Sequence, residues 1–323
     1  MESNKDVTAL RLKQYKKLTT VKTVSFAIFR YFILFSIGYL VVYPLIYMIS
    51  SAFKSPEDFM NPGIVWLAQN PTWQNFKDAF KVLNFTDSLK NTITLEMVSA
   101  VLEILSCSVA AYGLARFDFP TKKITMAALM MTIIVPSTMI IIPTVVNFSN
   151  LDFLGIVGLI NKITGADIKI NILDTPLTFY LPSIFGVGLR SGIMIFIYMQ
   201  FFKGLPKELE EAAQIDGASA VATFIRIALP SSRVVILTVS VFAVIWHWND
   251  YYLSVMYTSQ DYPLAVAVAN MITTITSSVS TNSDIITAVS MAGCLMFIMP
   301  VLIAYMFVQK GFIKSIDRVG ITG

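Results

Sequence analysis

Charged residues, cysteine and histidine are all scarce in this sequence. Asp, Glu, Lys and Arg make up 14% of its 323 residues, whereas hydrophobic residues make up 55%. Cys107 and Cys294 both lie inside apolar segments, which favours neither a disulfide framework nor a metal site. The single histidine, His247, has no second histidine with which to share a metal ion. We therefore expect His247 to be a hydrogen-bonded core residue and the chain to bind no metal.

Several catalytic and binding motifs are missing as well. The sequence contains no G-x-x-x-x-G-K-[ST] phosphate loop, no H-E-x-x-H and no nucleophile elbow, so it predicts neither an ATPase nor a recognisable enzyme. Its basic residues are not interleaved with exposed aromatics, which argues against a nucleic-acid partner. We expect no cofactor to be bound by this chain itself.

Long apolar runs dominate the rest of the sequence. Six of them reach the roughly twenty residues that a membrane-spanning helix needs, and lipid leaves their backbones no other hydrogen-bonding arrangement. The sequence therefore predicts an all-α membrane protein with six transmembrane helices. The predicted spans are 26–53, 92–117, 124–148, 177–202, 234–257 and 285–308. The prolines that we expect to kink them are Pro44, Pro136, Pro143, Pro182 and Pro300.

The placement of lysine and arginine predicts the orientation. These residues gather in the tails and loops that face the cytoplasm if the N-terminus is inside, so both termini should be cytoplasmic. The predicted organisation is a cytoplasmic tail (1–25), a transmembrane domain (26–309) and a second cytoplasmic tail (310–323). In the first external loop, residues 73–83 have the apolar periodicity of an interfacial helix.

One predicted cytoplasmic loop, 205–230, differs from the short polar connections elsewhere. Pro206 suits a first helical turn, acidic residues follow at the positive end of the helix dipole, and Gly217 permits the tight turn that ends the helix. The spacing alone fits a well-capped interfacial helix as well as a docking helix with a small-residue face. The acids are Glu208, Glu210 and Glu211, and the small residues are Ala212 and Ala213.

The residues of this loop resemble the EAA loop of ABC-importer permeases. The pattern is Glu211-Ala212-Ala213, three residues, Gly217, nine residues, then Ile227-Ala228-Leu229-Pro230. The flanking residues 205–210 and 215–219 look like the carbohydrate branch, particularly its maltose-type subunits. Similarity extends over roughly residues 26–315 and includes Trp246-His247-Trp248-Asn249, whereas Met199 and the last five residues depart from the family pattern.

This resemblance implies a type I ABC-importer permease in the bacterial plasma membrane. Its partners would be a homologous second permease, two ATPase subunits that hold ATP and Mg, and an external solute-binding protein. The loop 203–233 would be the coupling segment that docks on an ATPase subunit. The coupling residues carried over are Glu210, Glu211, Ala212, Ala213, Asp216, Gly217, Ile227, Leu229 and Pro230.

Four ionisable residues, Glu96, Glu103, Arg190 and Asp250, fall inside the predicted spans. Glu96 and Glu103 are two helical turns apart on one stripe, which fits either a polar cavity wall or a pair of tethers to neighbouring helices. Glu103 lies about twelve residues below Asn91 and Arg190 about thirteen below Leu177, so at about 1.5 Å per residue both are expected at nearly the same depth. We therefore predict that they form a buried ion pair.

The segment 246–252 in the fifth predicted span combines aromatic and polar residues. Such groups can stack on sugar rings and bind hydroxyls, whereas Trp248, Tyr251 and Tyr252 are equally typical of an aromatic belt at the membrane surface. The candidates for the substrate path are Glu96, Glu103, Arg190, Trp246, Asn249 and Asp250.

Three transport functions are compatible with these features. The first is a sugar-importer permease, and the second is the same machine with an amino acid, peptide or polyamine as cargo. The third is a proton-coupled carrier that uses Glu96, Glu103 and Arg190 as a relay. The EAA-like loop argues against the third, because a self-sufficient carrier has no ATPase to contact.

Overall fold

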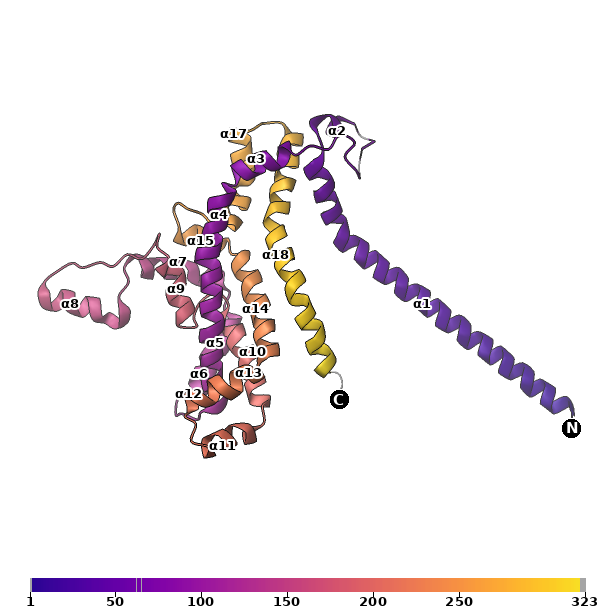
Figure 1. The fold of residues 1–323 in the computed structure, drawn as a ribbon, viewed down its shortest axis with the longest axis horizontal. Coiled ribbons are helices and arrows are strands. Elements are labelled where there is room, and N and C mark those ends of the chain that lie inside the picture. Colours follow the sequence, from indigo (N-terminus) through magenta and orange to yellow (C-terminus); the bar gives the residue numbers. More distant parts are fainter. Residues whose placement is uncertain (1, 62, 65, 320–323) are drawn as a thin grey trace.

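Helices account for the regular structure of the computed structural model, which describes residues 2–61, 63–64 and 66–319; no strand occurs in these ranges (Figure 1). Three stretches are long and apolar enough to cross a membrane: Lys22–Phe53, Phe85–Arg116 and Ser283–Gln309. The predicted all-helical class is confirmed for this part of the chain. The elements that form these stretches are α1 (Glu2–Phe53), α4 (Phe85–Asn91), η1 (Thr92–Met97), α5 (Val98–Arg116) and α18 (Ser283–Val319).

Two further candidate spans are bent helix pairs. The first joins α6 (Lys122–Ile134) to α7 (Ser137–Ser149), and the break follows from Pro136, which forces the preceding Val135 into an extended conformation. The second is bent by 79° at Ser232, between the segment Ala220–Ser231 and α14 (Arg233–Trp248). That segment consists of α12 (Ala220–Thr223), η3 (Phe224–Ala228) and α13 (Leu229–Ser231). By length and composition the described residues thus contain three spans, or five if each bent pair counts as one.

The fourth predicted span, 177–202, is interrupted in the middle. It consists of α9 (Leu177–Ile184) and α10 (Ser191–Gly204), and the connection contains two residues with positive φ, Gly186 at 66° and Arg190 at 58°. A left-handed conformation cannot continue an α-helix, so neither half reaches membrane length. Length and composition alone therefore do not confirm six spans.

Short helices mark the two ends of the bundle. α2 (Pro56–Met60), α3 (Gln74–Val82) and α17 (Met271–Ser278) lie together at one end, here called the α3 end (Figure 1). α3 confirms the helix predicted over 73–83. α11 (Lys207–Ile215) and α12 lie at the opposite end, here called the α11 end. The remaining elements are η2 (Phe153–Gly155), α8 (Ile156–Thr164), α15 (Tyr252–Tyr257) and α16 (Leu264–Ala269).

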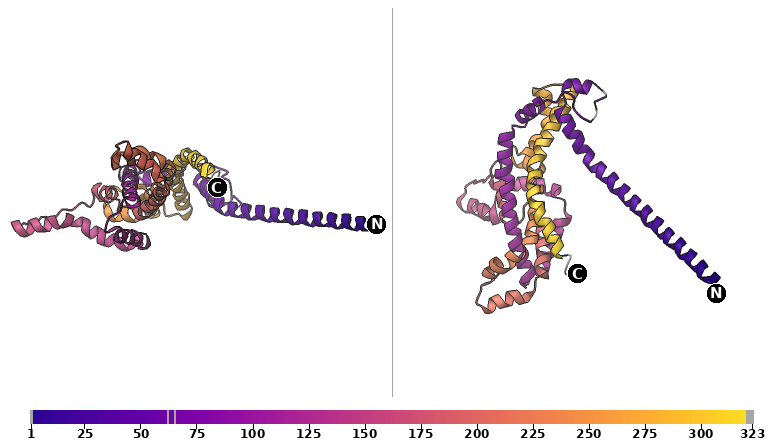
Figure 2. Two further views of the ribbon diagram at one scale, coloured as in Figure 1. Left: turned by 90° about the horizontal axis from the view of Figure 1, so that it is seen from below. Right: turned by 45° about the vertical axis from the view of Figure 1, so that its right-hand side comes forward.

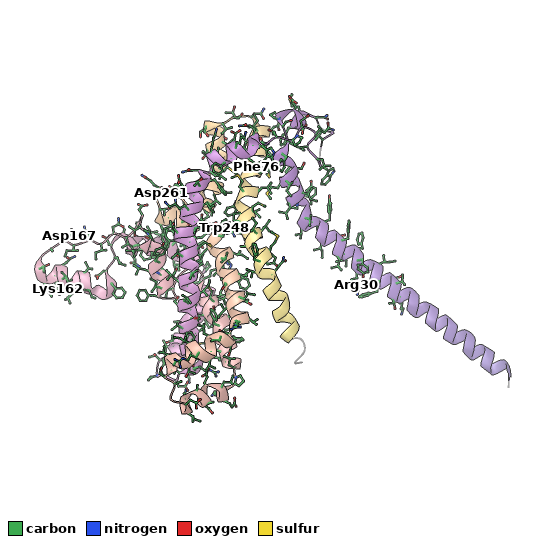
Figure 3. All side chains as sticks on the ribbon, in the orientation of Figure 1. Arg30, Phe76, Lys162, Asp167, Trp248 and Asp261 are labelled. Carbon is green, nitrogen blue, oxygen red and sulfur yellow. The ribbon has the colours of Figure 1, made fainter. Side chains whose placement is uncertain are left out.

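The core is built around α5, which packs against α9, α10 and α14. Tyr198 and Phe202 of α10 are fully buried there. A second cluster forms where α18 packs on α3 and α17, around Leu83 and Met271. Only the end of α1 joins this packing, and the rest diverges from the bundle, as the two views of Figure 2 and the position of Arg30 in Figure 3 show. Its long apolar surface is typical of a helix covered by lipid or by another protein.

Gly192 sets the distance between α10 and α6. A Cβ at this position would collide with Oγ1 of Thr132, which donates to the Leu129 carbonyl at 2.7 Å. We expect Gly192→Ala to push the helices apart and lower the free energy of unfolding by about 1–3 kcal/mol. Thermal melting in detergent measures this loss. Gly204→Ala is the matched control, because no atom lies within 4 Å of its Cβ position. Equal melting of both variants would contradict the close approach.

Candidate functional site

The predicted coupling loop forms a compact helical arm at the α11 end. α11 (Lys207–Ile215) is followed by α12 (Ala220–Thr223), η3 (Phe224–Ala228) and α13 (Leu229–Ser231). Gly217 has φ 82°, and the turn is closed by bonds from Gly217 N to Gln214 O and from Ala218 N to Ala213 O. The left-handed glycine is why α11 ends here, as the sequence predicts.

The acids of α11 point in different directions. Glu211 is exposed, together with Ala212 and Asp216, so these residues are available to a partner. Glu210 is instead turned into the protein, where its Oε1 accepts a hydrogen bond of 2.9 Å from Nε of Arg116. Of the other residues carried over from the family, Pro230 is exposed, and Ala213, Ile227 and Leu229 are half-buried.

A second polar feature lies buried inside the bundle and is centred on His247 of α14. Its Nδ1 lies 2.8 Å from Oε2 of Glu96, and its Nε2 lies 2.8 Å from Oε2 of Glu103. The two remaining carboxylate oxygens also accept hydrogen bonds, from Ser254 at 2.8 Å and from Ser191. This buried polar cluster therefore joins η1, α5, α10, α14 and α15. The prediction of a hydrogen-bonded core histidine is confirmed.

Asp250 lies beside this cluster, immediately after α14. Its Oδ1 accepts a hydrogen bond of 3.3 Å from the backbone N–H of Leu253, while its buried Oδ2 has no hydrogen-bond partner. Within the described ranges, no three His, Cys, Asp or Glu side chains are arranged to hold a metal ion.

The predicted ion pair between Glu103 and Arg190 is wrong. Glu103 is bonded to His247 and Ser191, whereas the Arg190 guanidinium lies over the Trp246 ring, 5.0 Å from its centroid. The prediction that Glu103 and Arg190 lie at equal depth assumed a continuous fourth span. The chain is instead non-helical before Arg190, which has φ 58° and is exposed. The cation–π contact provides Arg190 with a partner without burying its charge.

The other candidates for the substrate path fall into two groups. Glu96, Glu103 and Asp250 are buried, whereas Trp246 is half-buried and Asn249 is exposed. Trp246 stacks on Phe242 with the ring centroids 5.3 Å apart. The structure therefore does not bring the six candidates together on one surface.

The aromatic-belt interpretation is wrong for Trp248. Its ring is buried, its Nε1 donates to the Phe297 carbonyl at 3.1 Å, and it packs on the Phe297 ring between α14 and α18 (Figure 3). Tyr252, in contrast, is 60% exposed, as a belt residue would be.

Two kinds of contact at these sites were not predicted from the sequence. The contact between Arg116 and the coupling loop was not predicted, although a basic residue in a last helical turn near an acidic loop was the available signal. Ser191 and Ser254 carried no signal, because their contacts with Glu103 and Glu96 depend on breaks before α10 and α15 that periodicity does not show.

These features define a polytopic helical membrane protein with a separate polar loop at one end. Residues 104–318 match the family model described as "Binding-protein-dependent transport system inner membrane component". The match covers well over half of the chain, which therefore belongs to this family and is a multi-pass protein of the bacterial plasma membrane.

Known proteins that resemble the chain are similar over most of its length. The "Putative ABC transporter permease protein ORF2" of Caldicellulosiruptor sp. is 27% identical over 298 residues, 91% of this chain and 96% of the relative. The "Arabinooligosaccharides transport system permease protein AraQ" of Halalkalibacterium halodurans is 25% identical over 297 residues, 89% and 93% of the two chains. A crystal structure of a bacterial ABC transporter involved in alginate import shares the fold, with a TM-score of 0.69, 19% identity and coverage of 89% and 96%.

Proposed function

We propose that this chain is the permease subunit of an ATP-driven importer that moves a sugar or oligosaccharide into the cytoplasm. The observation that carries this proposal is the geometry of the loop at the α11 end. There Glu211, Ala212 and Asp216 are exposed on a short helix that ends at the left-handed Gly217. In a member of this transport family, such a surface is suited to receive an ATPase subunit.

The partners follow from the family. A homologous second permease would complete the transport path, two ATPase subunits would hold ATP and Mg, and an external binding protein would deliver the substrate. The α11 end would then be cytoplasmic, together with both termini, and the α3 end would face outward. The chain would then have six spans. Three are the long helical stretches of α1, α4 to α5, and α18. The other three would be α6 with α7, α9 with α10 as one broken span, and α14 continued through α15.

A carbohydrate is the cargo that the relatives favour, since their names refer to arabinooligosaccharides and alginate. The structure narrows the acids that a cationic amino acid or polyamine could use. Both intramembrane glutamates are engaged by His247 and a serine, which leaves Asp250, whose buried Oδ2 has no hydrogen-bond partner, as the carboxylate that such a ligand would have to reach. A proton-coupled carrier is less well supported, because it would leave the exposed face of α11 without a function.

Reconstitution of the complete transporter tests this proposal. The chain would be assembled in proteoliposomes with its partner permease, its ATPase and its binding protein. Uptake of labelled malto-, arabino- and alginate oligosaccharides would be compared with uptake of an amino acid and a dipeptide. We expect ATP-dependent uptake of one saccharide class only. Uptake that is driven by a pH gradient without ATP would contradict the proposal.

Arg190, Trp246 and Asn249 are the candidates that are not buried, and the last two lie together on the segment that combines aromatic and polar residues. We expect Trp246→Ala and Asn249→Ala to weaken uptake of the preferred saccharide by roughly 5- to 10-fold, because a stacking or hydrogen-bonding contact contributes about 1 kcal/mol. ATP hydrolysis without substrate should persist. Tyr31→Ala on the diverging part of α1 serves as the control. Unchanged uptake in both α14 variants would assign the contacts to the partner permease.

A further inference from the structure

Arg116 is the last residue of α5 and joins this span to the coupling loop at two points. Its Nε donates to Oε1 of Glu210 at 2.9 Å, and its Nη2 donates to the carbonyl of Leu205 at 2.9 Å. A cation in the last turn of a helix also interacts favourably with the carbonyl groups exposed there. Arg116 thus contacts both the residue before Pro206, where the loop starts, and the middle of α11 (Lys207–Ile215).

The ion pair of Arg116 and Glu210 is more deeply buried than a second ion pair near the α11 end. The Arg116 and Glu210 side chains are 7% and 11% exposed, so water and salt screen them little. The pair of Lys122 and Asp118 lies close by in sequence but is 27% and 96% exposed. Exposed pairs of this kind contribute little to stability, whereas breaking a buried pair leaves an uncompensated charge.

The two contacts of Arg116 fix the orientation of α11 as well as its position. α11 has nine residues, and a helix of this length is marginal when it is isolated. It packs on α12 and η3, which belong to the same loop. The Leu205 carbonyl and the Glu210 carboxylate are separate points along the loop. Their attachment to one rigid guanidinium therefore defines the direction of α11 relative to α5.

We propose that Arg116 is a positioning residue that makes α11 and α5 move as one body. The proposal rests on the proposed function and deepens it, because it names how a push from an ATPase subunit on Glu211 would enter the membrane. α5 carries Glu103, and η1 directly before it carries Glu96. Both glutamates are bonded to His247 of α14, so the movement would reach a second span through the buried polar cluster.

The experiment uses the reconstituted transporter with its ATPase, its partner permease and its binding protein. Its readout is the amount of labelled oligosaccharide transported per ATP hydrolysed, normalised to the complex present in the membrane. We expect Arg116→Gln to lower this ratio about tenfold while ATP hydrolysis continues. Arg116→Lys keeps the charge but loses the two-point geometry and should fall in between. The exchange of both residues, Arg116→Glu with Glu210→Arg, should recover part of the loss.

The control is Lys122→Gln, which removes a cation from the exposed pair and should leave the ratio unchanged. A wild-type ratio in Arg116→Gln would overturn the positioning role. If that variant fails to assemble, Arg116→Lys decides, and an unaltered ratio there would overturn it equally. A wild-type complex that shows no ATP-dependent uptake would instead contradict the proposed function, whatever the variants do.

Discussion

Replacing Glu211 with lysine is expected to abolish transport while the protein still inserts into the membrane. Glu211 is exposed on α11 and is not needed inside the protein, where Glu210 occupies the internal position beside Arg116. A charge-assisted hydrogen bond across an interface contributes about 1.5–3 kcal/mol. In Glu211→Lys this attraction is lost, and the new positive charge would repel a basic partner. Binding-protein-stimulated ATP hydrolysis and uptake should therefore fall roughly 10-fold or more.

Gly217 offers an independent test of the same loop. Its φ of 82° is unfavourable for a β-branched residue, although its Cβ position is open space. We therefore expect Gly217→Val to displace the end of α11 and lower ATP hydrolysis together with uptake.

Both variants have matched controls. Glu57→Lys makes the same charge change at an exposed position of the α3 end, and Gly38→Val adds the same side chain in open space on α1, where φ is not positive. We expect both controls to transport normally. Full stimulated hydrolysis and uptake in Glu211→Lys would show that this loop does not contact the ATPase through that residue.

Local signals in the sequence were sufficient to predict the helix of the coupling loop and the short helix at the α3 end. α11 starts directly after Pro206 and ends at Ile215, two residues before Gly217, and Pro206 and Gly217 act through their own backbone geometry. α3 was predicted from apolar periodicity alone. In each case the interactions that determine where the helix forms involve residues close together in the sequence, so the surrounding fold does not change its position.

The breaks inside the spans could not be predicted in the same way. Hydropathy measures how apolar a segment is, and 177–202 is predominantly apolar with Arg190 as its single charged residue. The break with the left-handed Gly186 and Arg190 follows a contact with another helix, because Oγ of Ser106 in α5 donates to the Ser183 carbonyl at 2.6 Å. Depth calculated at 1.5 Å per residue therefore failed for Arg190. His247 was correctly expected to be satisfied, but its two partners depend on the packing of α14 against α5.

Replacement of His247 by leucine is expected to be the most damaging single change to the stability of this chain. It would leave Glu96 and Glu103, which are at most 1% exposed, without the group that bridges them. Removing one partner from a buried ionic network typically costs roughly 3–5 kcal/mol, because the remaining charge stays desolvated. We expect much less protein in the membrane and a lower melting temperature in detergent.

Arg190→Met is the matched control for the loss of an intramembrane cation. Arg190 is exposed and contacts the Trp246 ring without an acidic partner, so its removal should cost only about 0.5–1 kcal/mol. Had the expected pairing of Arg190 with Glu103 been correct, both variants would lose similar stability. The difference between them therefore tests the buried polar cluster directly.

A combined variant separates loss of charge balance from loss of packing. His247→Leu with Glu96→Gln and Glu103→Gln removes the histidine together with the two carboxylates that it bridges, so neither carboxylate is left without its partner, while Asp250 beside them is unchanged. Ser254 and Ser191 can still donate to the two amide oxygens in place of the carboxylates. We expect the triple variant to recover part of the melting temperature that His247→Leu loses. Purely additive losses across the three sites would mean that His247 and the glutamates act separately, and they would contradict a coupled cluster that joins the second and fifth predicted spans.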